Sequence, residues 1–317
     1  MANEAANELA SKVAMTHSPS RDTITRFVFE HAPVRGVLVN LDAAACAILD
    51  CHPYPPALRR VLAELLAASA LLSSTLKFSG SLIMQLQGSG PVRLLVVECN
   101  DALELRATAQ WDAQRTMAIG PAGTLAELAG GPTQGRLVIT LDPKGNGTLY
   151  QGIVTLETAS VAALIEHYLA TSEQLASRLV LATDGSRAGG LLVQRLPGGD
   201  APGQPGEDAT WARAEERLTQ VDPVTLLAPG TAETLLAEAF PQDDLRVFRP
   251  KHVSFRCSCS RERVERALRI AGKAEIESIL AERDDVEVTC EFCNRTYAFA
   301  PAEARAVFAA QASSLRH

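Results

Sequence analysis

The sequence predicts an α+β fold class with three parts: an N-terminal core domain of mixed sheet and helix, a helical linker region and a small C-terminal zinc-binding domain. Strand and helix patterns occur in separate runs before residue 197. A stretch rich in proline and glycine interrupts the chain at 197–206, and two closely spaced cysteine pairs lie near the C-terminus. The expected parts are a mobile N-terminal tail at 1–22, the core at 23–197, a flexible and metastable linker at 198–250, and the zinc-binding domain at 251–317.

The composition allows a large buried core and argues against nucleic acid as a partner. Of the 317 residues, 47% are hydrophobic and 21% are charged, and the formal net charge is −7 with a pI near 5.5. Binding to nucleic acid requires cations that replace the counterions of the phosphates. The acidic excess lies in the linker, because residues 198–250 hold 4 Lys and Arg against 10 Asp and Glu, a difference of −6.

Neither an export signal nor a membrane span is expected. The segment Met1–Asp22 carries Glu4 and Glu8 and lacks an apolar run. The longest apolar stretch, Val61–Leu76, contains Glu64 and several serines, which favours a buried helix. We therefore expect a cytoplasmic protein with no membrane partner. The seven cysteines would face a reducing environment, where closely spaced thiols serve metal or redox chemistry.

Within the core, seven segments carry strand patterns and two carry helical spacing. One helical stripe follows Pro55-Pro56 and runs from Leu58 to Leu72. The other runs from Val161 to Leu169, with Ser160 as its N-cap. The expected strands are Ile24–Phe29, Val34–Leu41, Ser81–Gln87, Val92–Cys99, Leu103–Trp111, Arg136–Leu141 and Tyr150–Leu156.

The linker carries two short amphipathic segments, Trp211–Val221 and Thr231–Phe240. Being short, acidic and flanked by proline, they are expected to be helical only when docked on another surface. An ordinary helical connector is the alternative interpretation. If docking is lost, their apolar side chains become exposed. These side chains are Trp211, Leu218, Leu226, Leu227, Leu235, Leu236 and Phe240, and sheet surface beneath the helices would be exposed with them.

The strongest chemical signal is Cys257-Ser258-Cys259, followed after 30 residues by Cys290-Glu291-Phe292-Cys293. Four thiolates suit one tetrahedral Zn²⁺ per chain, with Zn–S distances of about 2.3 Å. Cys257 and Cys259 occupy positions i and i+2, which share one face of an extended strand.

The residues around the second pair are consistent with such a site. Asn294 tolerates the left-handed backbone that a tight C-x-x-C turn often requires. Between the pairs, Arg261–Ala271 and Ala274–Ala281 show helical spacing and can return the chain so that the cysteine pairs meet.

An iron–sulfur cluster and a set of unrelated buried cysteines are the alternatives to zinc. A deaminase is excluded because no histidine is followed two residues later by glutamate, and His252 is expected to be solvated and not a ligand. Cys46, Cys51 and Cys99 lack paired spacing and are expected to be buried, inert thiols. Without a nucleophile motif, a P-loop or a dinucleotide fingerprint, the sequence predicts no enzyme and no catalytic residue.

A closed zinc site can still act as a switch. A domain of about 60 residues has a marginal core, and structural zinc can supply about 10 kcal/mol of folding free energy. Oxidation of the thiolates would remove the ligands, release zinc and unfold the domain. The docked linker helices would then lose their support.

Several segments resemble one known family. The zinc-centre segments are Phe255-Arg256-Cys257-Ser258-Cys259-Ser260-Arg261-Glu262-Arg263 and Cys290-Glu291-Phe292-Cys293-Asn294. The upstream segments are Leu76-Lys77-Phe78, Gln85-Leu86-Gln87-Gly88-Ser89-Gly90-Pro91, Tyr150-Gln151-Gly152-Ile153-Val154, Tyr168-Leu169-Ala170-Thr171-Ser172-Glu173-Gln174 and Ala188-Gly189-Gly190-Leu191-Leu192-Val193-Gln194. In this order, over most of residues 23–308, they closely resemble the redox-regulated heat-shock protein 33 family of bacterial chaperones.

The resemblance implies an ATP-independent holdase that prevents aggregation of unfolding clients under oxidative and heat stress. With that function, the seven apolar linker side chains named above become the candidates for binding clients, and the sheet surface beneath them is a further candidate. It implies that the reduced, zinc-bound form is inactive, and that peroxide forms Cys257–Cys259 and Cys290–Cys293 disulfides and expels zinc. It further implies a disordered linker, a homodimer when oxidised, and transfer of clients to ATP-dependent refolding chaperones.

A constitutive zinc-ribbon module that binds a protein or nucleic acid is the alternative function. The near-neutral C-terminal charge disfavours it. Compared with the family, the N-terminal tail looks longer and the stretch at 197–206 looks enlarged.

Overall fold

The computed structural model describes residues 21–314 except 77–78, 146, 158–159 and 198–204. Most of the predicted N-terminal tail and most of the Pro/Gly-rich stretch therefore lie outside the described residues. The tail prediction is wrong for its last two residues. Asp22 is buried and accepts hydrogen bonds from the backbone of Asp42 and Ala44, and Arg21 donates to the carbonyl of Ala228.

The core contains two antiparallel sheets, which confirms the α+β class. The first has the strand order β10-β1-β2-β9-β8, with β11 also paired to β1. Its strands are β1 (Thr23–Phe29), β2 (Val34–Leu41), β8 (Ser177–Thr183), β9 (Ala188–Arg195), β10 (Leu245–Val247) and β11 (Lys251–His252).

The second sheet has the order β12-β5-β4-β3-β6-β7, and only the pairing of β12 with β5 is parallel. All seven strands predicted in the core are present, within two residues at each end. The strands of this sheet are β3 (Gly80–Gly88), β4 (Val92–Asn100), β5 (Glu104–Trp111), β6 (Gly135–Pro143), β7 (Tyr150–Thr155) and β12 (Ser254–Phe255).

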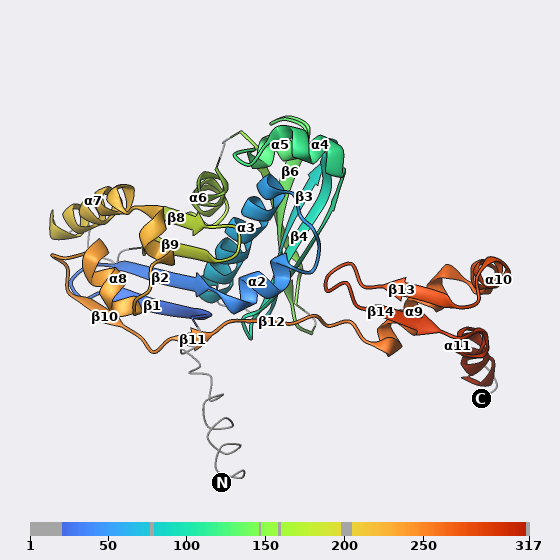
Figure 1. The fold of residues 1–317 in the computed structure, drawn as a ribbon. Coiled ribbons are helices and arrows are strands. Elements are labelled where there is room, and N and C mark those ends of the chain that lie inside the picture. The colour runs from blue at the N-terminus through green and yellow to red at the C-terminus, as the bar shows by residue number, and fades with distance from the viewer. Residues whose placement is uncertain (1–20, 77–78, 146, 158–159, 198–204, 315–317) are drawn as a thin grey trace, which may run out of the picture.

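Helix α3 (Pro56–Thr75) lies between the two sheets and contacts β2 and β9 on one side and β3 and β4 on the other (Figure 1). Proline at its first position is favourable there, because that N–H has no partner within the helix. The helix is apolar nearly all round, as a helix buried on all sides must be. Among the described residues, no helix is long and apolar enough to cross a membrane.

Shorter helices complete the core domain. Helix α6 follows β7, and Ser160 accepts a hydrogen bond from Ala163 N, which confirms the predicted N-cap. In α5, Thr124 and Glu127 form a capping box. These helices are α2 (Ala43–Leu49), α4 (Ala113–Ile119), α5 (Leu125–Ala129) and α6 (Val161–Thr171).

The linker docks on the face of the first sheet that points away from α3 (Figure 1). It forms α7 (Pro205–Gln220), the 3₁₀ helix η1 (Pro223–Leu227) and α8 (Ala232–Ala239). Six of the seven predicted client-binding side chains are buried there, and Leu227 is partly buried. They pack against sheet residues that include Phe27, Leu38 and Leu191. Helix α7 begins earlier than predicted, so Pro205 and Gly206 belong to a helix and not to a flexible stretch.

Strands β8 and β9 were not predicted. Adjacent glycines weaken a strand pattern, and β9 contains Gly189 and Gly190. Close packing on both faces of β9 explains why these two positions are glycine. A β-carbon at Gly190 would lie 2.8 Å from Leu71 Cδ1 of α3, and one at Gly189 would lie 3.0 Å from the carbonyl oxygen of Leu226 in the linker.

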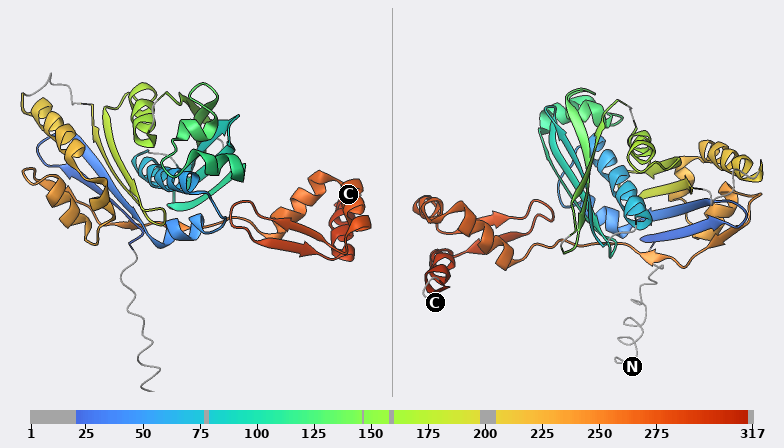
Figure 2. Two further views of the ribbon diagram at one scale, coloured as in Figure 1. Left: turned by 45° about the horizontal axis from the view of Figure 1, so that its top comes forward. Right: turned by 180° about the vertical axis from the view of Figure 1, so that it is seen from behind.

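The chain from linker to C-terminal unit runs along both sheets. Strands β10 and β11 pair with β1 of the first sheet, and β12 pairs with β5 of the second. The C-terminal unit projects beside the second sheet, on the opposite side of the molecule from α7 (Figure 2). Its elements are α9 (Arg261–Ala271), α10 (Lys273–Glu282), β13 (Val286–Thr289), β14 (Thr296–Phe299) and α11 (Pro301–Ser314).

Phe240 at the end of α8 tests the linker docking. Its ring centroid lies 5.9 Å from that of Phe27 and 5.2 Å from that of Phe29, and the side chain is 1% exposed. We expect Phe240→Ala to destabilise the docked linker by about 3–5 kcal/mol. Native-state hydrogen exchange of α7 and α8 measures this, with Val224→Ala, at a side chain 68% exposed, as the control. Equal exchange in both variants would contradict the docking.

Candidate metal centre

The structure brings all four predicted cysteines together, with every pair of sulfurs within 4.8 Å. The Sγ atoms of Cys257 and Cys290 are 3.6 Å apart, and those of Cys259 and Cys293 are 3.3 Å apart. One pair follows β12 and the other lies in the turn between β13 and β14. The prediction that one strand carries the first pair is wrong, because β12 ends at Phe255.

The sulfur geometry fits a metal ion. A tetrahedral ion with metal–sulfur bonds of about 2.3 Å separates its ligand sulfurs by about 3.8 Å, and a disulfide requires about 2.05 Å. The four thiols are free and half-buried, and their sulfurs lie at the spacing of a tetrahedral four-sulfur site. A soft four-thiolate set suits zinc, and it leaves no open coordination position for a catalytic water.

The second cysteine pair lies on the left-handed turn that the sequence predicted. Asn294 has φ 57°, its N–H donates to Cys290 O at 2.8 Å, and Cys290 N donates to Arg295 O at 2.9 Å. The helices between the pairs are present as predicted. Behind the turn, a small hydrophobic cluster buries the side chains of Val264, Leu268, Ile276, Val286, Phe299, Ala304 and Val307.

The thiols differ in their surroundings. Burial alone would raise the pKa of Cys259, but hydrogen bonds from Tyr297 Oη, at 3.1 Å, and from the neighbouring thiols outweigh it and lower this pKa to about 7. Burial raises the pKa of Cys257 and of Cys293. A divalent cation is the natural means of holding four such groups as thiolates in one place.

The metal centre rests directly on the core through contacts that the sequence analysis missed. Glu291, inside the C-x-x-C turn, accepts at its backbone oxygen from Thr108 Oγ1 at 2.8 Å and from His52 Nε2 at 2.6 Å. These contacts join residues more than 180 positions apart in the chain. No local pattern could have revealed them.

Arg106 of β5 touches both cysteine pairs. Its Nη1 donates to Ser258 Oγ at 2.7 Å, between Cys257 and Cys259. Its guanidinium carbon lies 4.3 Å from the ring centroid of Phe292, inside the other pair. Glu98 holds the same guanidinium, accepting from Nε at 2.9 Å. One core side chain therefore contacts both halves of the metal centre.

The remaining cysteines are not part of the four-sulfur cluster. Cys99 is fully buried, and burial raises its pKa to about 12. Cys46 and Cys51 are only half-buried, so the prediction that their side chains are buried is wrong. A hydrogen bond to Asp50 raises the pKa of Cys46, and burial raises that of Cys51, which favours the unreactive thiol form. His252 is exposed, as expected.

Fold and site together define a two-sheet α+β protein with a four-cysteine metal centre on a separate C-terminal unit. The model of the family described as Hsp33 protein matches residues 22–300. A protein of Methylobacillus flagellatus named 33 kDa chaperonin is 41% identical over 288 residues, covering 90% of this chain and 94% of its own. One of Nitrosococcus oceani with the same name is 41% identical over 302 residues, covering 94% and 99%.

A solved structure has the same fold. The crystal structure of the 33 kDa chaperonin (heat shock protein 33 homolog) from Thermotoga maritima matches with a TM-score of 0.74 at 20% identity, covering 92% of this chain and 99% of its own. The chain belongs to the Hsp33 family. The names of the relatives support a chaperone as its class of function.

Removing two ligands tests the metal centre. We expect Cys290→Ala with Cys293→Ala to reduce bound zinc from about one per chain toward zero, because two of four ligands are lost. Cys46→Ser, at a thiol outside the cluster, is the control and should retain zinc. Colorimetric zinc assay of the purified, denatured proteins measures the content. Full zinc in the double variant would place the metal elsewhere.

Arg106→Ala tests the contact between metal centre and core. Loss of the charge-assisted hydrogen bond and the ring contact should weaken docking by about 1–3 kcal/mol. Zinc content should not change. In ¹⁵N relaxation, α9–α11 should then tumble more independently of the core. Arg136→Ala is the matched control, since Arg136 lies in the same sheet and its guanidinium binds Gln87. Identical relaxation of the two variants would exclude Arg106 as an anchor.

Proposed function

We propose that this protein is a redox-regulated, ATP-independent holdase whose reduced form holds one Zn²⁺ at Cys257, Cys259, Cys290 and Cys293. The observation that carries the proposal is the meeting of four free thiols in a chain whose linker has its apolar side chains buried against the core. Membership of the Hsp33 family supports it. The clients are unfolding proteins, and the protein acts in the cytoplasm without catalysing a reaction on them.

Oxidation by peroxide converts the ligands into two disulfides, Cys257–Cys259 and Cys290–Cys293. In each pair, one thiolate attacks the peroxide, becomes a sulfenic acid and releases water once protonated. The second thiolate then attacks the sulfenic sulfur, closes the disulfide and releases a second water. Both pairs together consume two peroxides and four protons, transfer four electrons and release Zn²⁺ and four waters.

Zinc release unfolds the C-terminal unit because its own core is small. Seven buried side chains form the cluster behind the metal centre. Structural zinc supplies about 10–16 kcal/mol of apparent folding free energy in small domains. A unit of this size cannot replace such a contribution by packing.

Unfolding then spreads to the linker along the connecting chain. The contacts of Glu291 and Phe292 with the core are lost first, since both residues lie within the turn that holds the metal. Next are the short pairings of β12, β11 and β10, which have two or three residues each. Beyond β10 is α8, whose docking these strands support.

Release of the linker exposes two apolar surfaces for clients. One is formed by the buried faces of α7, η1 and α8, from Trp211 to Phe240. The other is the sheet surface beneath them, with Phe27 and Phe29 of β1. Such surfaces bind exposed apolar segments of unfolding proteins. The oxidised protein forms a homodimer and passes clients to ATP-dependent refolding chaperones.

The function is tested by aggregation of a thermally unfolding client, followed by light scattering. Protein treated with peroxide at mild heat should suppress aggregation and should have released its zinc, because the linker surfaces are then exposed. The reduced, zinc-bound protein should suppress little. The Cys46→Ser variant serves as the control for oxidation outside the cluster.

Two outcomes count against the proposal. Equal protection by the reduced and oxidised forms would remove redox regulation. Retention of zinc and fold after oxidation would instead support a constitutive zinc-ribbon interaction module.

A further inference from the structure

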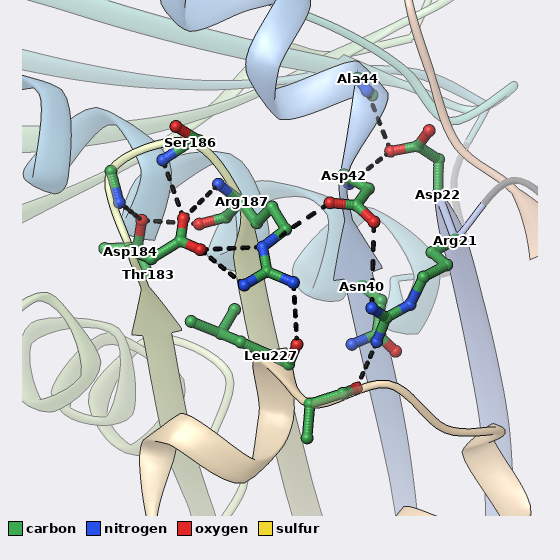
Figure 3. A network of polar contacts seen from close by, with 12 residues as sticks. Arg21, Asp22, Asn40, Asp42, Ala44, Thr183, Asp184, Ser186, Arg187 and Leu227 are labelled. Atoms are coloured by element: carbon green, nitrogen blue, oxygen red, sulfur yellow. Dashed lines mark hydrogen bonds and ion pairs between the residues drawn. The ribbon is translucent and has the colours of Figure 1, made fainter.

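Three consecutive backbone carbonyls of the linker are held by polar side chains of the core. Leu226 O accepts from Asn40 Nδ2 at 2.7 Å, Leu227 O accepts from Arg187 Nη1 at 3.2 Å, and Ala228 O accepts from Arg21 Nη2. Figure 3 shows both guanidinium groups reaching the linker from the core side. The carbonyls lie at the C-terminal end of η1, where a helix leaves its last carbonyls without partners and favours cations.

Acidic side chains fix the two arginines in place. Asp184 Oδ2 accepts from Arg187 Nε at 2.8 Å. Asp42 lies between the two guanidinium groups, 3.8 Å from Arg187 Nε and 4.0 Å from Arg21 Nη1 (Figure 3). Asp42 is itself held, because its N–H donates to Asp22 Oδ1 at 2.7 Å. The two guanidinium groups are therefore positioned by acidic residues of the core and not by the linker.

Apolar packing near η1 is incomplete. A groove of about 280 Å³ lies between the linker and the first sheet, lined by Leu226, Leu235 and Leu236 together with Leu38 and Leu191 of the sheet. A gap beside these side chains removes contacts that would otherwise hold the linker. The hydrogen bonds to η1 attach the linker to the core where the apolar packing is incomplete. They recognise backbone, so they do not depend on which side chains follow Leu226.

These contacts are separate from those of the metal centre. Asn40, Arg187 and Arg21 belong to β2, the β8–β9 turn and the segment before β1, all in the first sheet. The metal centre contacts the second sheet, at β5. Loss of zinc therefore removes neither the donor nor the acceptor of any of the three hydrogen bonds to η1.

We propose that Asn40, Arg187 and Arg21 form a polar clamp, a second hold on the linker that acts independently of zinc. The inference rests on the proposed function, because the clamp keeps the apolar linker surfaces covered. Both holds must open before the linker is released. Since two of the three donors are guanidinium groups, the clamp weakens as salt screens their charges.

The test compares the reduced wild type with Asn40→Ala, Arg187→Gln and the double variant. Hydrogen exchange of peptides from residues 211–240 measures linker opening, and a colorimetric assay measures zinc. The double variant should exchange at least about tenfold faster in the linker, since the charge-assisted hydrogen bond of Arg187 alone contributes over about 1.4 kcal/mol, a factor of ten. Zinc should stay bound, and peptides from α3 should exchange as in the wild type.

Ser186→Ala is the matched control, because Ser186 precedes Arg187 in the same turn and engages Asp184 through its backbone. High salt should accelerate linker exchange in the wild type and less in the double variant, which retains only the guanidinium group of Arg21, and mere loss of packing would not cause this difference. Unchanged linker exchange in the double variant overturns the clamp. Loss of zinc together with faster exchange also overturns it, since the two holds would not be independent. Neither readout requires a client, so failure of the holdase function is detected separately.

Discussion

Convergence of four sulfur atoms on one point is the constraint on which the C-terminal unit depends. The two cysteine pairs come from chain segments separated by two helices, and the sulfurs nevertheless lie within 4.8 Å of one another. Unscreened thiolates at such distances would repel one another strongly. In the proposed function, a tetrahedral cation turns this repulsion into the main attraction that holds the unit. Because sulfur can also be oxidised, the proposal makes that attraction sensitive to peroxide.

Core contacts and a run of short strands connect the metal centre to the linker. Arg106 contacts residues inside both cysteine pairs, so each pair has a direct contact with the core. From there the chain runs along the edges of both sheets through three short strands before it reaches α8. The linker helices in turn cover the outer face of the first sheet. In the proposed function, this path connects oxidation at the sulfurs to exposure of the apolar linker surface far from them.

Prediction from sequence succeeded where a pattern is local. Runs of β-branched and aliphatic residues bounded by turns identified the seven strands from β1 to β7, periodicity identified α3 and α6, and the cysteine spacing identified the four thiols that the fold brings together. It failed at β9, where Gly189 and Gly190 suppress the strand pattern because α3 and the linker approach the backbone closely. Arg106 and Arg187 could not be recognised either, since each looks like an ordinary polar residue near a strand end or turn. Their importance arises from partners distant in sequence, which only the fold brings together.

Removal of zinc without any oxidant tests the central claim most directly. A strong chelator applied to the reduced protein separates the structural effect of the ion from the chemistry of sulfur, and hydrogen exchange then reports on each part of the chain. The account predicts that α9, α10 and the β13–β14 hairpin lose protection once zinc is gone, while α3 keeps its protection. A metal-free C-terminal unit that stays as protected as the zinc-bound one would contradict the account.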